Sequence, residues 1–446
     1  MSTSTAAVEE AQAEILHRKN LAVREVILNR PKKLNALNLS MIRAITPELK
    51  AWEKSDLAKI VLLKSSGGKG FCAGGDVKSV VDLAKAGDPD AATFFEEEYQ
   101  LDHFIATLNT PYVSVMDGIT MGGGVGLSVH APFRIATENT LFAMPETAIG
   151  FLPEVGGSFF LSRLDGQLGV YLGLTGKRLK GADVLYAGVA THYVPSARLP
   201  ALEARLAELE DASHDVVNTA IEEFSAEMES EKPFSLGGEV RAAIDRCFKY
   251  DTVEEIVEAI KKEDSEWGQE TLKLLNSMSP TSLKVTLQQL RNGADLSIAQ
   301  CFKMEYHLVQ KFLEGHDFAE GVTAVLVTRS EANWKPASLQ EVDKDKIKKE
   351  YFDAPSPKRL ELLSTKDFSQ YPHRKYMLPS EEEIKRVVTG EAPDVGQYAL
   401  TRDEVVNYFV TRRNHKQGVK SKVLEVLDRK TRVNEKDEGK SLKWSY

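Results

Sequence analysis

The sequence predicts an α/β fold, and three observations support this prediction. Between residues 21 and 196, short apolar runs typical of strands alternate with helix-like segments. From residue 197 onward the pattern becomes mostly helical. A hydrophobic share of 42% with 28% charged residues over 446 positions fits a globular chain with a substantial core. We therefore expect strand–strand–helix units that are closed by C-terminal helices.

The expected elements follow one another closely along the chain. Strands are expected over residues 21–29, 60–66, 112–118 and 133–145, and core helices over 39–55, 75–87, 124–130, 168–176 and 179–190. Later helices are expected over residues 198–212, 253–264, 269–278 and 297–315, where apolar residues recur at helical spacing.

This pattern divides the chain into four parts. Residues 1–20 are expected to be a loose arm or a short helix, residues 21–196 the α/β core, and residues 197–345 its helical C-terminal part. Residues 346–446 are expected to be a helical extension with a basic end. The first residues resemble neither a signal peptide nor an Arg-rich transit peptide. No apolar run approaches the roughly 18 residues of a membrane helix, so no membrane partner is expected.

Charge is distributed unevenly along the chain. The formal net charge of −9 disfavours a general affinity for nucleic acid. From residue 401 to residue 446, however, 12 Lys and Arg stand against 7 Asp and Glu, a net charge of +5 that leaves −14 on the first 400 residues. This asymmetry fits either an interaction tail or a solvated helix of mixed charge, and the second is the commoner case.

The cysteine and histidine patterns argue against a metal or disulfide framework. The three cysteines (Cys72, Cys247 and Cys301) are far apart, which indicates a reducing compartment rather than a disulfide scaffold or a zinc site. The histidines show no clustered ligand spacing, so we expect no metal. His103, His130 and His192 are expected to be ordinary core or surface residues.

Two glycine turns stand at strand-to-helix junctions: FCAGGD at residues 71–76 and MGGGVG at residues 121–126. Backbone N–H groups at a helix start lack partners, so two such turns can direct two donors at one carbonyl oxygen. The alternative is that the glycines serve close packing of strand against helix. Neither turn matches a dinucleotide or P-loop motif. The serine of VGGSFF is no nucleophile elbow, because Phe160 stands where the second glycine is needed.

Three glutamates are candidates for a buried site. MPETAIGFLPEVGG, residues 144–157, places Glu146 and Glu154 in an otherwise apolar segment, where an unpaired carboxylate is costly to bury. They are a catalytic pair, one catalytic residue beside a structural one, or two surface charges, and the pattern alone leaves this open. Glu98 lies four residues after Phe94 and three before Leu101, near the apolar face of its helix.

Four motifs together closely resemble the enoyl-CoA hydratase/isomerase (crotonase) superfamily. They are NRPKKLNALN (29–38), FCAGGD (71–76), ITMGGGVGLSVH (119–130) and MPETAIGFLPEVGG (144–157). The chain is most similar to the 3-hydroxyisobutyryl-CoA hydrolase branch, as KGADVLYAGVATHYV, SPTSLKVTLQQL and WKPASLQEV also indicate. The resemblance spans about residues 20–345. It implies a crotonase-like spiral of ββα units followed by C-terminal helices, in agreement with the pattern above.

The resemblance also implies a layout of the site. The thioester oxygen would be held by the backbone N–H groups of Gly75 and Gly123, which form an oxyanion hole. Glu146 and Glu154 would be catalytic, and the same two residues would bind substrate together with Glu98 and Gly123.

The CoA part of the substrate would lie elsewhere in the same motifs. The backbone around Lys33, Leu34, Ala73 and Gly74 would hold it, and because CoA belongs to the substrate, no separate cofactor is implied.

Two positions distinguish the branches of the superfamily. Hydratases carry a catalytic glutamate where this chain has Gly126, which disfavours hydration of a double bond and favours thioester hydrolysis. The hydrolases carry aspartate where this chain has Glu154. An extra methylene moves the carboxylate by about 1.5 Å, and a 1 Å misplacement can cost about 10²-fold in rate. Glu154 therefore either serves with local adjustment or marks a weakened enzyme.

The implied activity is hydrolysis of a short branched hydroxyacyl-CoA, 3-hydroxyisobutyryl-CoA, to 3-hydroxyisobutyrate and CoA in mitochondrial valine catabolism. Glu146 would attack the thioester to form an anhydride or would activate water, and the sequence leaves both open. The alternative is a family member co-opted as a structural subunit of the small subunit of the mitochondrial ribosome, with the extension as its interface to a protein or ribonucleoprotein partner. A homo-oligomer is expected from the family unless the extension blocks those contacts.

Overall fold

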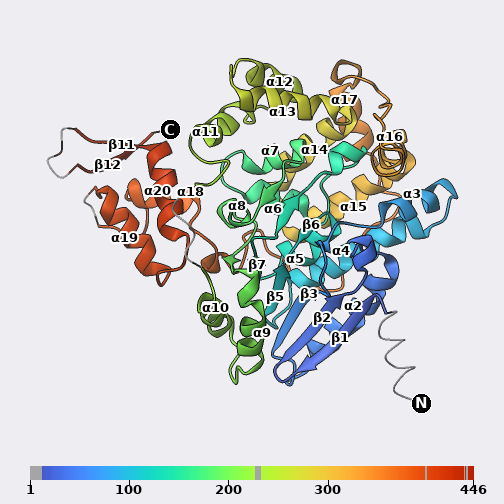
Figure 1. The fold of residues 1–446 in the computed structure, drawn as a ribbon. Helices are drawn as coiled ribbons and strands as arrows, with labels where there is room; N and C mark the ends of the chain where they lie inside the picture. Colours follow the sequence, from blue (N-terminus) through green and yellow to red (C-terminus); the bar gives the residue numbers. More distant parts are fainter. Residues whose placement is uncertain (1–12, 227–232, 397–398, 436, 438–439, 446) are drawn as a thin grey trace, which may run out of the picture.

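Two sheets built from alternate strands of one repeating unit form the centre of the structure (Figure 1). The computed structural model describes residues 13–226, 233–396, 399–435, 437 and 440–445. The strand pairs β3–β4, β5–β6 and β7–β8 each give their first strand to a six-stranded sheet and their second strand to a four-stranded sheet, whereas β1 and β2 both lie in the six-stranded sheet. The predicted α/β class with ββα units and C-terminal helices is therefore confirmed.

The larger sheet has the order β1-β2-β3-β5-β7-β10. Its strands are β1 (Ile15–Asn20), β2 (Val23–Leu28), β3 (Ile60–Ser65), β5 (Tyr112–Met116), β7 (Phe133–Ala136) and β10 (His192–Tyr193). All neighbours are parallel except β1 and β2. The inner strands read as continuous apolar runs because helices cover both faces of a parallel sheet.

The smaller sheet has the strand order β4-β6-β8-β9. Its strands are β4 (Gly70–Cys72), β6 (Ile119–Met121), β8 (Leu141–Ala143) and β9 (Leu179–Lys180). The expected single run over residues 133–145 is thus two strands, β7 and β8. A turn separates them, in which the Thr137 N–H donates to Thr140 Oγ1 at 2.8 Å.

The expectation of a loose arm or short helix over residues 1–20 is wrong for its last part. Residues 15–20 are β1, which pairs antiparallel with β2 along its whole length. Only Ile15 of β1 is buried, because β1 is an edge strand with one polar, solvated face. Residues 1–12 of the expected arm lie outside the described residues.

Helices surround the two sheets and continue to residue 347. In the core they are α2 (Leu39–Trp52), α3 (Val77–Lys85), α4 (Asp90–Ala106), α5 (Gly123–Val129), α6 (Gly157–Phe160), α7 (Leu168–Thr175) and α8 (Ala182–Tyr186). After them come α9 (Leu199–Ala207), α10 (His214–Glu222), α11 (Gly238–Cys247), α12 (Val253–Lys261), α13 (Glu266–Ser277), α14 (Pro280–Gly293), α15 (Ile298–Glu314), α16 (His316–Gly321) and α17 (Lys344–Ile347). Serine or threonine side chains cap α10 and α12 to α15, as expected for helix starts. Helix α15 packs on α4. Within the described residues, none of the helices is long and apolar enough to cross a membrane.

The extension has two parts, which we name the strap (residues 353–380) and the module (residues 381–445). The strap contains one short helical turn, η8 (Arg374–Tyr376), and otherwise follows the surface of the core. The module contains α18 (Glu381–Val388), α19 (Arg402–Arg412), α20 (Val419–Lys430) and a hairpin of β11 (Thr431–Val433) with β12 (Leu442–Trp444). The extension thus contains the expected helices α18 to α20, whereas most of the strap and the hairpin are not helical.

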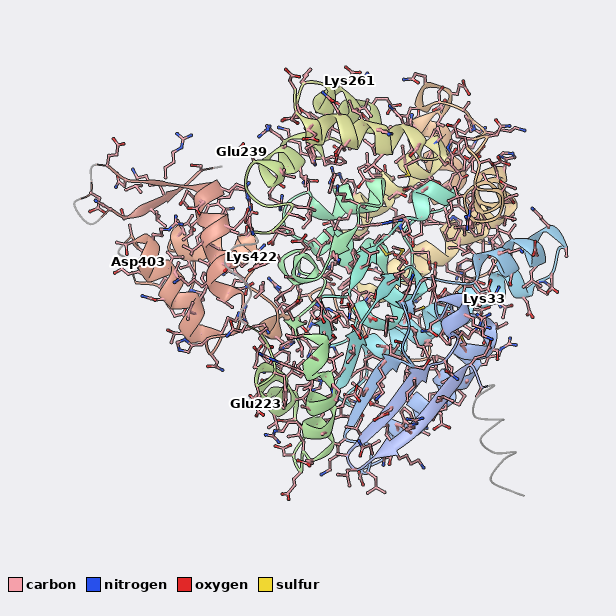
Figure 2. The ribbon with its side chains drawn as sticks, in the orientation of Figure 1. Lys33, Glu223, Glu239, Lys261, Asp403 and Lys422 are labelled. Carbon is pink, nitrogen blue, oxygen red and sulfur yellow. The ribbon has the colours of Figure 1, made fainter. Side chains whose placement is uncertain are left out.

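The module lies at one side of the body (Figure 1), and its basic side chains meet acidic residues there. Lys422 Nζ lies 2.7 Å from Asp165 Oδ2, and Lys430 Nζ lies 3.4 Å from Asp245 Oδ2. Figure 2 shows Lys422 where the module faces the body, while Asp403 lies farther out. Part of the positive charge that the sequence places at the chain's end thus pairs with carboxylates of the core.

Candidate active site

Two glycine turns meet where the smaller sheet gives way to helices. Gly74 and Gly75 follow β4, and Gly122 and Gly123 follow β6. Because β4 and β6 are parallel neighbours, both turns leave the same end of the sheet. A Cβ built on Gly123 would lie 3.5 Å from the backbone nitrogen of Gly75, so the two turns are in contact.

The amides of Gly75 and Gly123 are not used by the fold. The bridge between Leu37 and this turn uses neighbouring groups: the Leu37 N–H donates to Gly74 O at 2.8 Å, and the Asp76 N–H donates to Leu37 O at 2.7 Å. Within the described residues, neither the Gly75 nor the Gly123 N–H donates to a protein acceptor. Two free amides this close together can receive one carbonyl oxygen.

The glycines also serve close packing. A Cβ on Gly124 would lie 2.3 Å from Cys72 O, and a Cβ on Gly123 would lie 2.4 Å from Glu98 Oε1. The packing explanation of the glycine cluster is therefore confirmed, because the glycines let α5 lie close to β4 and let a carboxylate approach the turn. The role of the amides as donors to a carbonyl oxygen stays a prediction.

Three carboxyl groups surround the turns. Glu98 lies on α4, Glu146 begins the short helix η2 (Glu146–Ile149), and Glu154 lies in the turn before α6. Their exposed fractions are 1%, 4% and 5%, so all three are buried. Each has an oxygen without a hydrogen-bond partner in the described structure: Oε1 of Glu98 and Oε2 of the other two. Glu146 approaches the turn from the side of Gly122, where a Cβ would lie 3.2 Å from its Oε1.

Burial and mutual repulsion change the acidity of these groups. Burial raises the pKa of Glu146 to about 8. Burial, followed by the charge of Glu146, raises the pKa of Glu98 to about 8. The pKa of Glu154 is also raised, by burial and by the charges of Glu98 and Glu146. With pKa values of about 8, Glu98 and Glu146 are mostly protonated at neutral pH, and the raised pKa of Glu154 favours its neutral form as well. A protonated carboxyl can act as an acid.

A strained turn carries Glu154. Val155, a β-branched residue, has a φ of 54°, a conformation that costs free energy and is retained where the surroundings impose it. His130 Nε2 lies 2.7 Å from Val155 O. Glu305 on α15 accepts from the Gly156 N–H at 2.7 Å and from the Ser158 N–H at 2.8 Å. These contacts fix the position from which the Glu154 side chain enters the site.

The four candidate CoA-binding residues lie together beside the first turn. The Ala73 N–H donates to Leu34 O at 3.0 Å, which joins the segment around Lys33 and Leu34 to the segment of Ala73 and Gly74. Leu34 adopts the left-handed conformation with a φ of 51° and is 36% exposed. In Figure 2, Lys33 lies on the side of the body opposite the module. The structure thus brings the nine predicted site residues into one region.

Comparison with known proteins identifies the family of this arrangement. The profile of the enoyl-CoA hydratase/isomerase family matches residues 23–352. The chain belongs to this family. A carnitinyl-CoA dehydratase from Mycobacterium thermoresistibile has a similar structure, with a TM-score of 0.73 and 36% identity over 79% of this chain and all of that one.

Two relatives differ in how much of the chain they match. The 3-hydroxyisobutyryl-CoA hydrolase of Xenopus laevis is 52% identical over 325 residues, which cover 72% of this chain and 84% of that protein. The small ribosomal subunit protein mS47 of Neurospora crassa is 48% identical over 439 residues, which cover 93% of this chain and 85% of that protein. The similarity to the ribosomal protein therefore includes most of the extension.

Gly126 stands where hydratases of this family carry a glutamate, and another carboxyl group lies beside it. A Cβ on Gly126 would lie 2.4 Å from Asp102 Oδ2, so the carboxyl of Asp102 fills the space beside this glycine. Asp102 is fully buried, and neither of its oxygens has a partner in the described structure. Burial and the charges of Glu98 and Glu305 raise its pKa, which favours the neutral form of Asp102.

Asp102, Glu305 and Gln289 were not found from the sequence. Gln289 donates to Pro153 O at 2.7 Å and so holds the other side of the Glu154 turn. Asp102 follows Glu98 by one helical turn, a spacing that could have indicated a shared face. Glu305 and Gln289 carry no local signal, because they are about 150 residues from the turn that they hold. Within the part of the chain that the structure describes, no group of three or more His, Cys, Asp or Glu could hold a metal ion.

Proposed function

We propose that this chain hydrolyses 3-hydroxyisobutyryl-CoA to 3-hydroxyisobutyrate and CoA in mitochondria. One observation carries the proposal: three buried carboxyl groups surround a pair of free amides, in a chain 52% identical to a hydrolase with this substrate. Gly126 supports hydrolysis over hydration, because a hydratase would need a carboxylate on that residue. A carboxyl does lie there, but it belongs to Asp102, whose raised pKa favours the neutral form.

The reaction needs an activated oxygen nucleophile and a stabilised oxyanion. The thioester carbonyl would lie between the amides of Gly75 and Gly123, and each such donor is typically worth about 2.7–4 kcal/mol in the transition state. Glu146, in its ionised form, would attack the carbonyl carbon or take a proton from water that attacks it. The C–S bond then breaks, and a protonated neighbour, Glu98 or Glu154, would give its proton to the CoA thiolate. If Glu146 has attacked, water would then hydrolyse the resulting anhydride, which releases the acid product and regenerates the Glu146 carboxylate.

The Glu154 turn supports adaptation to the longer side chain. Its backbone is held by His130, Gln289 and Glu305, so the position of the Cα is fixed rather than loose. Glu154 is buried on this fixed turn and keeps one oxygen without a partner in the described structure. These features favour a carboxyl that is held in the site to take part in the reaction over one that is displaced from it.

Thioester hydrolysis on a small panel of acyl-CoAs, measured as CoA thiol release, tests this proposal. The wild type should prefer 3-hydroxyisobutyryl-CoA, and Glu154→Asp should give no marked gain. The matched control is Glu97→Asp, the same change at a half-buried glutamate of α4 that pairs with Arg43. A gain of about 10²-fold from Glu154→Asp alone would mean that the native site is compromised.

A second candidate function is a structural role in the small subunit of the mitochondrial ribosome. It is favoured by the similarity to mS47, which continues through most of the extension. The charge of the extension gives it little support as an RNA-binding tail. At least seven of its 12 Lys and Arg after residue 400 pair with carboxylates of this chain: Arg402, Arg412, Arg413, Lys416, Lys422, Arg429 and Lys430. Co-sedimentation with mitochondrial small subunits, with no turnover of 3-hydroxyisobutyryl-CoA, would establish this second role instead.

A further inference from the structure

A small cavity lies where the strap crosses the core, away from the carboxyl groups of the site. The core side is formed by residues of α5, α6 and η3 (Leu161–Arg163), and the strap contributes Tyr371, Arg374 and Met377. Its volume is about 70 Å³, which exceeds the space that a single water needs. The cavity is therefore large enough for a small polyatomic ligand.

Three arginines and no carboxylates line this cavity among the described residues. They are Arg134 on β7, Arg163 at the end of η3 and Arg374 on the strap. Arg163 donates only to oxygens of neutral groups, among them Gly293 O at 3.0 Å and Leu296 O at 2.7 Å. Arg374 pairs with Glu383 at 2.9 Å, but Glu383 is shared with Arg413 at 2.7 Å. The lining thus carries more positive charge than nearby carboxylates neutralise.

Arg134 is the most constrained of the three. Only 2% of it is exposed, and it forms no ion pair with any described residue. Its Nε donates to Val189 O at 2.6 Å, and its Nη1 donates to Ala131 O at 2.8 Å and to the Tyr371 hydroxyl at 2.7 Å. Its Nη2 has no acceptor in the described part of the chain. Buried charges in folded proteins are paired, so a buried guanidinium with a free N–H group beside a cavity calls for an anion.

We propose that this cavity binds a tetrahedral oxyanion of the phosphate class, held by Arg134 and Arg374. Guanidinium groups match the geometry of phosphate oxygens and form charge-assisted hydrogen bonds with them. A doubly charged oxyanion neutralises more of the lining than a monocarboxylate does. The proposal is independent of thioester hydrolysis, because none of the three arginines contacts the carboxyl groups of the site.

The position of the cavity ties the ligand to the extension. Arg134 and Arg163 lie within the region that the family profile matches, whereas Tyr371 and Arg374 lie beyond it. The binding site is complete only with the strap docked on the core. His130 also lines the cavity and contacts Val155 O, so the ligand would lie one side chain away from the turn that carries Glu154.

Titration of the full chain with inorganic phosphate by calorimetry, at constant ionic strength in chloride, tests the proposal. We expect saturable one-to-one binding and a weaker affinity for acetate. Arg374→Gln should raise the Kd by about tenfold or more, because it removes a charge-assisted hydrogen bond. Arg374→Lys, which keeps the charge, should retain more of the affinity than Arg374→Gln.

The matched control is Arg412→Gln, which changes another partly exposed arginine of the extension that pairs with Asp394 outside the cavity. It should leave the Kd for phosphate unchanged. Thermal unfolding of each variant shows whether the fold is intact, and phosphate should raise the Tm of the wild type more than that of Arg374→Gln. Absence of saturable binding to the wild type, equal affinities of the wild type and Arg374→Gln, or acetate binding as tight as phosphate would each overturn the proposal.

Discussion

The buried carboxyl of Glu146 makes a prediction that separates activity from stability. Glu146 is 4% exposed, and burial raises its pKa to about 8 from an ordinary value of 4.5. We predict that Glu146→Gln, which has the same shape and no charge, abolishes most thioesterase activity and stabilises the fold. Loss of a nucleophile or general base is expected to lower kcat by about 10²-fold or more.

The size of the stabilisation follows from the two pKa values. At pH 7 the folded protein keeps the proton on Glu146, while the unfolded chain releases it. Each of the roughly 2.5 pH units between 4.5 and 7 corresponds to about 1.4 kcal/mol, so the wild type loses up to about 3 kcal/mol that Glu146→Gln retains. Because the folded pKa is raised, the stabilising contribution of the protonated group is complete below pH 4.5 and declines as the pH rises to about 8.

The assay is urea unfolding of the wild type and Glu146→Gln at pH 5, 7 and 8.5. The stability difference between them should grow with pH. Glu258→Gln serves as the control, since this carboxylate is exposed and pairs only with Lys261. A Glu146→Gln variant that is less stable than the wild type at pH 8.5, or a difference independent of pH, would refute this reasoning.

Three further predictions concern residues outside the predicted site. Asp102→Asn should leave kcat/KM at pH 7 nearly unchanged, because burial and the neighbouring carboxyl groups favour the neutral form of Asp102. A large loss would mean that Asp102 acts as a carboxylate. Glu305→Ala should lower the free energy of unfolding by roughly 2–6 kcal/mol, since two buried N–H groups lose their acceptor. It should also lower kcat, and Glu305→Gln should restore part of the loss. An unchanged kcat would contradict the role of Glu305 in holding the turn. Lys422→Met should leave the Asp165 carboxylate buried without its ion-pair partner, which costs about 3–5 kcal/mol. The module should then become sensitive to limited proteolysis, while kcat stays unchanged. A module that resists proteolysis as in the wild type would contradict its attachment through this pair.

The same ion pair predicts acid release of the module. Burial alone would raise the pKa of Asp165, but Lys422 and the Glu381 N–H outweigh it and lower the pKa to about 2. The contribution of a carboxylate with a lowered pKa is present above its ordinary value of 3.8 and is lost as the pH falls toward 2.

Local patterns predicted most of the core, because its strands and helices bury continuous or periodic apolar faces. Strand β1 was missed since ILHRKN buries a single residue, and an edge strand needs no second apolar face. The sequence predicts a helical extension with a basic end but not the boundary within it, where Gly418 has a φ of 85° and separates α19 from α20. A glycine just before a helix was the signal that could have marked this boundary.

The candidate site could be predicted in part for a different reason. Glu146 and Glu154 stand out because a carboxylate in an apolar segment conflicts with burial, and Glu98 because of its place beside apolar helix positions. Asp102 and Glu305 stand in helical segments that also carry other polar residues, so nothing in those segments marks them as buried carboxyl groups. Their roles arise only when α4 and α15 pack against the glycine turns, which is a tertiary property that no local spacing contains.

The central claim is that the chain hydrolyses the thioester of 3-hydroxyisobutyryl-CoA, with the amides of Gly75 and Gly123 stabilising the oxyanion and Glu146 acting as nucleophile or general base. Its most direct test is the steady-state release of CoA thiol from this compound by the purified chain and by Glu146→Gln. The account predicts saturable turnover by the wild type, with kcat/KM rising with pH toward about 8 as Glu146 ionises, and almost none by the variant. Equal thiol release by the two proteins, or none by the wild type at any pH, would contradict it.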